Sequence, residues 1–212
     1  MKLKIANINW FGLAGGVTTI VLIIVSLFYP WWQLTVGTNF LKANASPVNT
    51  NFGFLGTSFT IPLIWALNII SLLSLTASGI VMLIYSFIPT KPYSKHLLGF
   101  AYKKPLFSVL FFVVGLLVIT LLFGTILSVN VPLMGSTTIT LPTVITSGVT
   151  ISFPVSAEFQ WPFWLAAVAA GLCLAARLYH KRVATAAQKP AQVTPVAAKT
   201  EPPTSPPETT TP

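Results

Sequence analysis

The chain has 212 residues, of which 54% are hydrophobic and 7% charged, and its formal net charge is +9. Soluble globular domains carry about 25% charged residues, so the composition predicts a membrane protein. Three residues are acidic, and only Glu158 precedes position 200. Acid–base catalysis, proton relay and metal binding all need such groups, so we expect a protein that is not an enzyme and holds no cofactor or metal.

Four apolar stretches are long enough for helices that cross a bilayer, which takes about 20 residues each. They predict spans over about 10–30, 62–88, 106–129 and 162–179. Basic residues gather before the first span, between the second and third, and after the fourth. Because lysine and arginine concentrate in cytoplasmic segments, both termini are expected in the cytoplasm, and the localisation is expected to be the plasma membrane. These residues are Lys2, Lys4, Lys91, Lys95, Lys103, Lys104, Arg177, Lys181 and Arg182.

This orientation makes segments 31–61 and 130–161 external loops. Their sequences favour β structure, so we expect a three- or four-stranded antiparallel sheet, formed by both loops together, that caps the outer end of the helices. Asn44 to Pro47 is typical of a turn, and Asn44-Ala45-Ser46 is also a sequon for glycosylation at Asn44. The segments that alternate apolar and polar residues, or that are rich in Thr, Val and Ile, are 33–36, 52–60, 136–141, 144–146 and 149–153.

The two remaining segments are predicted to be cytoplasmic. Residues 89–105 mix lysines with Tyr, Leu and Phe, which is typical either of a close inner loop or of a short amphipathic segment in the membrane interface. Residues 183–212 are mostly Ala, Pro and Thr with few apolar groups to bury, and they predict a disordered tail. The membrane domain is therefore expected to cover residues 1–182.

Small residues recur every four positions in three of the spans. Such spacing lets helix backbones approach closely, so these positions are candidates for helix packing within the chain or with a partner. They are Gly12 and Gly16; Thr120, Gly124 and Ser128; and Ala167, Gly171 and Ala175.

Ser71, Ser74 and Ser78 lie on one face of the second span, at i, i+3 and i+7. One interpretation is that they line a narrow aqueous path. The other is that their hydroxyl groups bond to a neighbouring helix. The sequence leaves both interpretations open.

Other residues that could support chemistry are few. His96 and His180 are predicted to lie at the cytoplasmic side, whereas Glu158 precedes the fourth span on the outer side, where it could pair with Lys42 or favour the start of that helix. An enzyme acting on lipid would depend on Glu158 or His180. The spans lack central charged residues, which argues against a proton-coupled transporter.

Together these features predict an all-α membrane protein: a four-span antiparallel transmembrane helix bundle with a small external β-rich cap and a disordered C-terminal tail. This architecture resembles the claudin type of tetraspan. The external loops lack the cysteine pair of that family, because the one cysteine, Cys173, lies in the fourth span. The resemblance therefore extends to architecture and implies no particular function.

The leading functional hypothesis is an accessory or scaffold subunit of a membrane or envelope complex. Its partners would be membrane lipids and another membrane or envelope protein, or a second copy of itself, and not nucleic acid. The alternative is a channel or transporter component for a small neutral solute, with Ser71, Ser74 and Ser78 lining the path.

Overall fold

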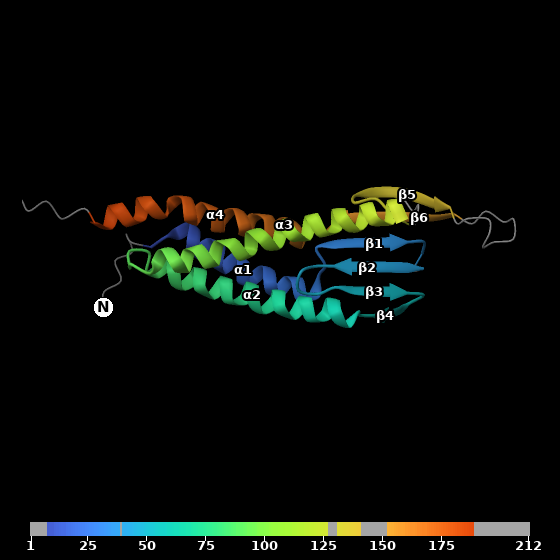
Figure 1. The fold of residues 1–212 in the computed structure, drawn as a ribbon, viewed down its shortest axis with the longest axis horizontal. Coiled ribbons are helices and arrows are strands. Elements are labelled where there is room, and N and C mark those ends of the chain that lie inside the picture. Colours follow the sequence, from blue (N-terminus) through green and yellow to red (C-terminus); the bar gives the residue numbers. More distant parts are fainter. Residues whose placement is uncertain (1–7, 39, 127–130, 141–151, 189–212) are drawn as a thin grey trace, which may run out of the picture.

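The computed structural model describes residues 8–38, 40–126, 131–140 and 152–188. Four long helices lie side by side, and a six-stranded antiparallel sheet lies at the end away from the N-terminus (Figure 1). All four helices are long and apolar enough to cross a membrane. The all-α class is too narrow a description, because the sheet is larger than predicted. Ser128, residues 144–146 and most of the predicted tail lie outside the described residues.

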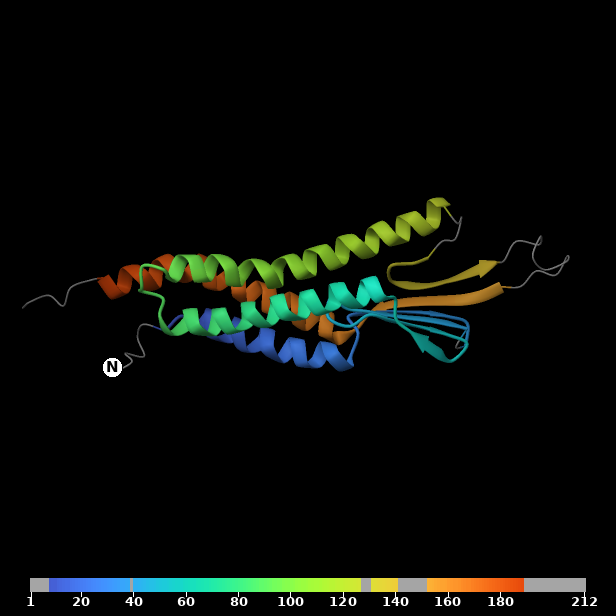
Figure 2. The ribbon, with the colours of Figure 1, turned by 60° about the horizontal axis from the view of Figure 1, so that its bottom comes forward.

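Each helix packs mainly against two others, in the ring order α1, α2, α3, α4 and back to α1. Neighbouring helices run in opposite directions (Figure 2). The ring places the first and last helices of the described chain in contact. The helices are α1 (Trp10–Phe28), α2 (Pro62–Phe87), α3 (Ser94–Ile126) and α4 (Trp161–Gln188).

Two helix boundaries differ from the prediction. The expected loop 89–105 is mostly helix, since α3 begins at Ser94 and continues through Pro105. Leu98, Ala101 and Pro105 recur at helical spacing and are buried, so packing outweighs the helix-breaking tendency of proline. Similarly, α4 continues to Gln188, past the predicted start of the tail at 183.

The sheet joins both loops between helices, as the sequence predicts. Its strand order is β4-β3-β2-β1-β6-β5, and Trp32 of β1 lies opposite Phe159 of β6. Strand β2 was not predicted, because its Lys, Ala and Asn residues are poor strand formers. Hydrogen bonds from β1 and β3 on either side hold it extended. The strands are β1 (Trp32–Val36), β2 (Leu41–Ala45), β3 (Asn51–Phe54), β4 (Thr57–Phe59), β5 (Gly135–Thr140) and β6 (Ser152–Phe159).

One face of the sheet packs over the end of α3. Trp32, Leu34 and Val155 from this face form a buried cluster with Leu116 of α3. The indole Nε1 of Trp32 also donates a hydrogen bond to the carbonyl oxygen of Leu133, at 2.8 Å. This packing fixes the sheet relative to the helices and leaves its other face exposed.

Candidate functional site

A buried polar cluster joins three helices at the end away from the sheet. The Asn9 amide Nδ2 donates to the Tyr85 hydroxyl at 2.8 Å and to the Ala176 carbonyl oxygen at 3.1 Å. The Tyr85 hydroxyl lies 2.9 Å from Nδ1 of His180. Because that hydroxyl accepts from Asn9, its own proton is available for His180. We call Asn9, Tyr85 and His180 the polar clasp; it links α2 and α4 to the start of α1.

His180 is held inside the helix bundle by its contact with Tyr85 in the polar clasp. Its side chain is 3% exposed and packed among the helices, which leaves little room for a substrate. Glu158 lies at the opposite end of the molecule, exposed on β6, where it accepts a hydrogen bond from Gln160. Lys42 does not neighbour it, because Glu158 lies opposite Gln33 whereas Lys42 lies opposite Thr35 on the other side of β1.

Gly12 and Gly16 lie where α1 meets α2. A Cβ atom added at Gly12 would lie 2.7 Å from Oγ of Ser86, and one at Gly16 would lie 2.8 Å from Cδ2 of Leu83. Both distances are shorter than van der Waals contact. The absence of a side chain at these two glycines therefore permits the close approach of α1 and α2.

Of the three predicted packing residues of the fourth span, two are exposed and Ala175 is partly buried. Ala167 and Gly171 are exposed, and a Cβ at Gly171 would meet no atom within 4 Å among the described residues. Small residues occur on several faces of α4, so spacing alone does not identify the face that packs. The small residues that α4 buries are Ala166, Ala169, Ala170, Cys173 and Ala176.

One contact partner of α4 is Gly15 on α1, which the sequence analysis did not single out. A Cβ at Gly15 would lie 3.0 Å from Sγ of Cys173. On α3, a Cβ at Gly124 would meet no described atom within 4 Å, while Thr120 lines a cavity beneath the sheet. The sequence shows the adjacent glycines Gly15 and Gly16, but it does not show which residue of α4 packs against Gly15.

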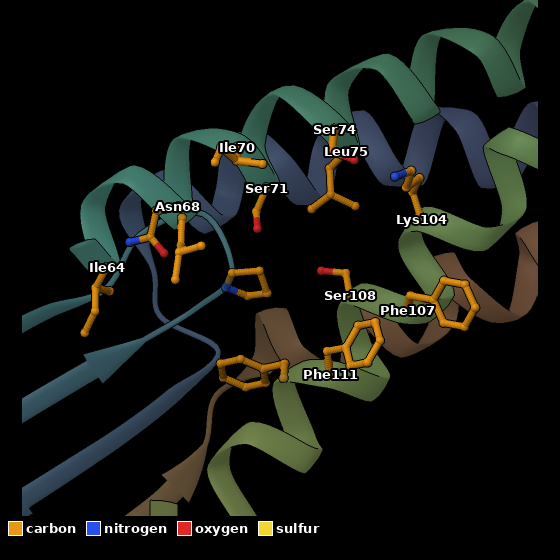
Figure 3. Close-up of a pocket in the computed structure, with 13 residues that line it drawn as sticks. Ile64, Asn68, Ile70, Ser71, Ser74, Leu75, Lys104, Phe107, Ser108 and Phe111 are labelled. Carbon is orange, nitrogen blue, oxygen red and sulfur yellow. The ribbon is translucent and has the colours of Figure 1, made fainter. Parts of the chain in front are cut away.

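The serine face of α2 divides into two parts. Ser71 and Ser74 line a groove of about 430 Å³ between α2 and α3 (Figure 3). Ser78 lies outside the groove, where its hydroxyl donates to the Ala101 carbonyl oxygen at 2.6 Å and joins α2 to α3. Ser71 and Ser74 thus share a position in the groove lining, whereas Ser78 makes a contact between helices.

Lys104 and Ser108 of α3 complete the polar lining of this groove. Ser71 and Ser108 point into it from opposite helices (Figure 3). The Ser108 Oγ is buried and has no hydrogen-bond partner in the described part of the chain. Asn68 also borders the groove, but its amide can bond to the Pro47 carbonyl oxygen and the Thr50 N–H and thus anchor the turn after β2.

Two further cavities adjoin the groove along α3. The first, about 440 Å³, lies beneath the sheet and shares Phe111 and Phe112 with the groove. The second, also about 440 Å³, lies near the start of α3 and shares Lys104. We call the first the apolar cavity and the second the basic depression. The basic depression is lined by Lys95, His96, Gly99, Phe100, Lys103, Lys104 and Phe107.

The hairpin of β3 and β4 exposes apolar side chains, and its turn lies at the end of the sheet farthest from the helices (Figure 1). Leu55 is 66% exposed, Phe59 48% and Phe54 44%. Leu55 and Gly56 form the turn with φ angles of 49° and 81°. A left-handed conformation suits glycine or asparagine and is strained for leucine. We call Phe54, Leu55 and Phe59 the hairpin tip.

Asn44, the candidate glycosylation residue, lies in β2 with paired strands on both sides. Its amide nitrogen, the atom that would carry a glycan, donates to Oδ1 of Asn51 at 3.0 Å. Ser46 of the sequon is 2% exposed. These contacts disfavour modification of Asn44 in the folded protein.

The described residues contain no group of three or more His, Cys, Asp or Glu side chains that could hold a metal ion. Comparison of the chain with protein-family models, with curated proteins and with solved structures found no match.

Proposed function

We propose that the protein is a non-enzymatic multi-pass membrane protein that serves as an accessory or scaffold subunit. The four apolar helices would cross the plasma membrane, with the sheet outside and both termini in the cytoplasm. Lys91 and Lys95 support this orientation, because they lie at the end of the helices opposite the sheet. The hairpin tip would contact a second membrane or envelope protein.

The observation that carries the proposal is Leu55. A turn residue with positive φ is normally glycine, asparagine or aspartate, and a leucine there is strained and also exposes its side chain to water. Neither feature helps the hairpin to fold. A protein partner that buries Leu55 together with Phe54 and Phe59 would account for both, since exposed apolar clusters of this kind mark interaction sites. The edge of β4 that has no partner among the described strands offers backbone hydrogen bonds to the same partner.

The alternative, a channel or transporter component for a small neutral solute, draws support from Ser71 and Ser74, whose side chains line the groove. The groove lies between α2 and α3 and does not run through the centre of the ring of helices. A second copy would therefore have to close it from the side. Ser78 would contribute no lining, because it bonds to Ala101.

The test is a pull-down of the tagged full chain from native membranes in a mild detergent. Leu55→Gly is the main variant, because glycine adopts the left-handed turn without strain and removes the apolar side chain. We expect a stoichiometric membrane or envelope partner with the natural chain and about tenfold less with Leu55→Gly, as for a residue central to an interface. Met134→Ser, at an exposed methionine outside the hairpin tip, should keep the partner.

Recovery of a homo-oligomer with no second protein would contradict the accessory-subunit proposal and favour the channel alternative. Flux of a neutral solute into liposomes that contain the protein would then be measured, and Ser71→Leu should block it. Equal partner recovery with Leu55→Gly and the natural chain would remove the hairpin tip from the interface.

A further inference from the structure

The apolar cavity lies between the sheet and the part of α3 that diverges from the start of α2 (Figure 2). Trp32, Leu34 and Leu116 line it and belong to one buried hydrophobic cluster, so they form a packed inner wall. Phe111 and Ile119 also line it, but they are 68% and 51% exposed and form its rim. The cavity is therefore shaped by the fold and accessible from outside.

Water is a poor occupant of this cavity. None of the lining residues is charged. The Ser46 hydroxyl already bonds to the backbone of Asn49, and the Thr50 hydroxyl donates to the Ser46 carbonyl oxygen. Apolar cavities exclude water and bind apolar molecules, and the volume of about 440 Å³ is within the range of ligand sites, about 300–1,000 Å³. The expected occupant is therefore apolar.

In the proposed orientation, the cavity begins at the outer boundary of the membrane. The Trp31 ring, just after the end of α1, lies 5.2 Å from the ring of Phe112 in the inward part of the lining. At the same end of the helices, Trp65 and Trp161 are 58% and 52% exposed, as is typical of aromatic residues at a membrane interface. From Phe112 to Thr120, which also lines the cavity, α3 rises by about 12 Å. The cavity thus extends outward from the membrane surface.

The groove joins the cavity to the depth of the outer leaflet. It shares Ile64, Phe111 and Phe112 with the cavity and continues inward from them as far as Leu75 on α2. Leu75 belongs to a buried cluster with Ile23 in the outer half of α1. The nearest source of an apolar occupant is therefore the hydrocarbon of the outer leaflet.

One lipid chain has a suitable length for the cavity. From Thr120 inward to Phe111, α3 covers about 14 Å, and one chain extends about 15 Å, which is half of the hydrocarbon thickness. A chain with its head end near Thr120 would fill the cavity and end where the groove begins. Its head end would point outward, as in the outer leaflet.

We propose that the apolar cavity holds one hydrocarbon chain of an outer-leaflet lipid, which is thereby raised partly out of the bilayer and lies beneath the sheet. The chain packs against Trp32, Leu34 and Leu116, and its polar head stays outside the cavity. Because no lining residue is charged, the site recognises the chain and not the head group. The proposal rests on the membrane orientation in the proposed function but does not involve the hairpin tip or its partner.

The test uses the full chain in nanodiscs of phosphatidylcholine that carries a photoreactive diazirine in the middle of one chain. Labelled residues are identified by mass spectrometry. In an undisturbed leaflet the middle of a chain lies deeper than Trp31. We expect labelling of Leu116 and Leu34, which a chain at its ordinary depth would not reach. The same chain on phosphatidylglycerol should label these residues to a similar extent.

Gly115→Leu is the main variant, because it places a side chain in the cavity. A Cβ at Gly115 would meet no described atom within 4 Å, and Gly115 lines the cavity. Labelling of Leu116 should fall about tenfold, the effect of losing the burial of about two methylene groups.

Gly124→Leu is the matched control on the same helix. A Cβ there also meets no described atom within 4 Å, and Gly124 does not line the cavity. It lies about two and a half turns beyond Gly115, on the opposite side of α3. Labelling of Leu116 should be unchanged. Folding of both variants is checked by circular dichroism and by elution as a single species.

Four results would overturn the proposal. Labelling confined to residues inward of Phe111 would place every chain at its ordinary depth. Equal labelling of Leu116 in Gly115→Leu and Gly124→Leu would show that the chain does not enter the cavity. Labelling that depends on the head group would contradict recognition of the chain. A dimer that Gly115→Leu converts to a monomer, with no label at Leu116, would identify a second copy as the occupant. None of these results would affect capture of a partner through Leu55, so the two proposals fail separately.

Discussion

The helices α1 and α3 have similar apolar sequences but make very different use of them. In the apolar span of α1, 39% of the positions are buried within the chain, whereas in that of α3 only 11% are buried. Most of the apolar surface of α3 is thus left for contacts with lipid or another protein. The comparison shows that hydrophobic length identifies a span but does not say whether it packs internally.

Side-chain size explains much of this difference. At Gly12, Gly15 and Gly16, α1 lets neighbouring helices come so close that a Cβ atom would lie within about 3 Å of them. At its open face, α3 has Phe107 and Phe111 instead. Helices in a membrane associate through close packing and not through exclusion of water. The glycines of α1 therefore favour internal contacts, whereas Phe107 and Phe111 of α3 are 42% and 68% exposed.

The strongest test of this comparison is a valine at Gly16. Its side chain would overlap Leu83, including the backbone nitrogen at 3.1 Å from the added Cβ, so we expect the free energy of unfolding to fall by about 2–3 kcal/mol. Gly171→Val adds the same atoms where nothing lies within 4 Å in the described structure and should change stability by less than about 0.5 kcal/mol. Unfolding by sodium dodecyl sulfate, followed by circular dichroism, measures both variants.

If Gly16→Val and Gly171→Val change the free energy of unfolding equally, the proposed difference in packing at these two glycines is wrong. Equal large losses would mean that the α4 face at Gly171 also packs tightly, for example against a second copy in the detergent-solubilised state. Equal small losses would mean that α1 and α2 can separate at little cost.

The next largest effect is expected at the polar clasp. Tyr85→Phe removes the hydroxyl that bonds to both Asn9 and His180, and we expect a loss of about 1–2 kcal/mol because buried polar atoms lose their partners. Tyr93→Phe is the control, since Tyr93 is 51% exposed. Combining Tyr85→Phe with Asn9→Ala in a double-mutant cycle should give a total loss smaller than the sum of the two. A strictly additive result would show that these side chains do not act together.

The sequence predicted the features that depend on composition over many residues. Four apolar stretches correspond to four helices, and the predicted segments 33–36, 52–60 and 136–141 correspond to strands. The predicted segment 149–153 overlaps β6 only at its first two residues, so most of β6 was not predicted. The predictions failed where contacts with other parts of the fold, and not the local sequence, determine the secondary structure. Pro105 is a typical helix boundary, yet buried Leu98 and Ala101 extend α3 on its N-terminal side. Strand β2 is held by its neighbours and not by its own residues.

The candidate site was predicted only in part for a similar reason. The spacing of Ser71, Ser74 and Ser78 correctly places them on one side of α2, but the sequence does not reveal that Ala101 accepts the hydrogen bond of Ser78. Nor does it reveal Lys104 and Ser108 as the facing residues. Both depend on how α3 lies against α2, which periodicity within one helix does not determine.

The smallest expected effects separate these serines. Ser78→Ala removes a 2.6 Å hydrogen bond between α2 and α3, and we expect a loss of about 0.5–1 kcal/mol, typical of such bonds between membrane helices. Ser71→Ala should change the free energy of unfolding by less than about 0.5 kcal/mol, because its side chain lines the open groove. Both are measured by the same detergent unfolding. An equal loss for the two serines would indicate that α3 closes on α2 along its whole length, and a groove open to lipid would then be excluded.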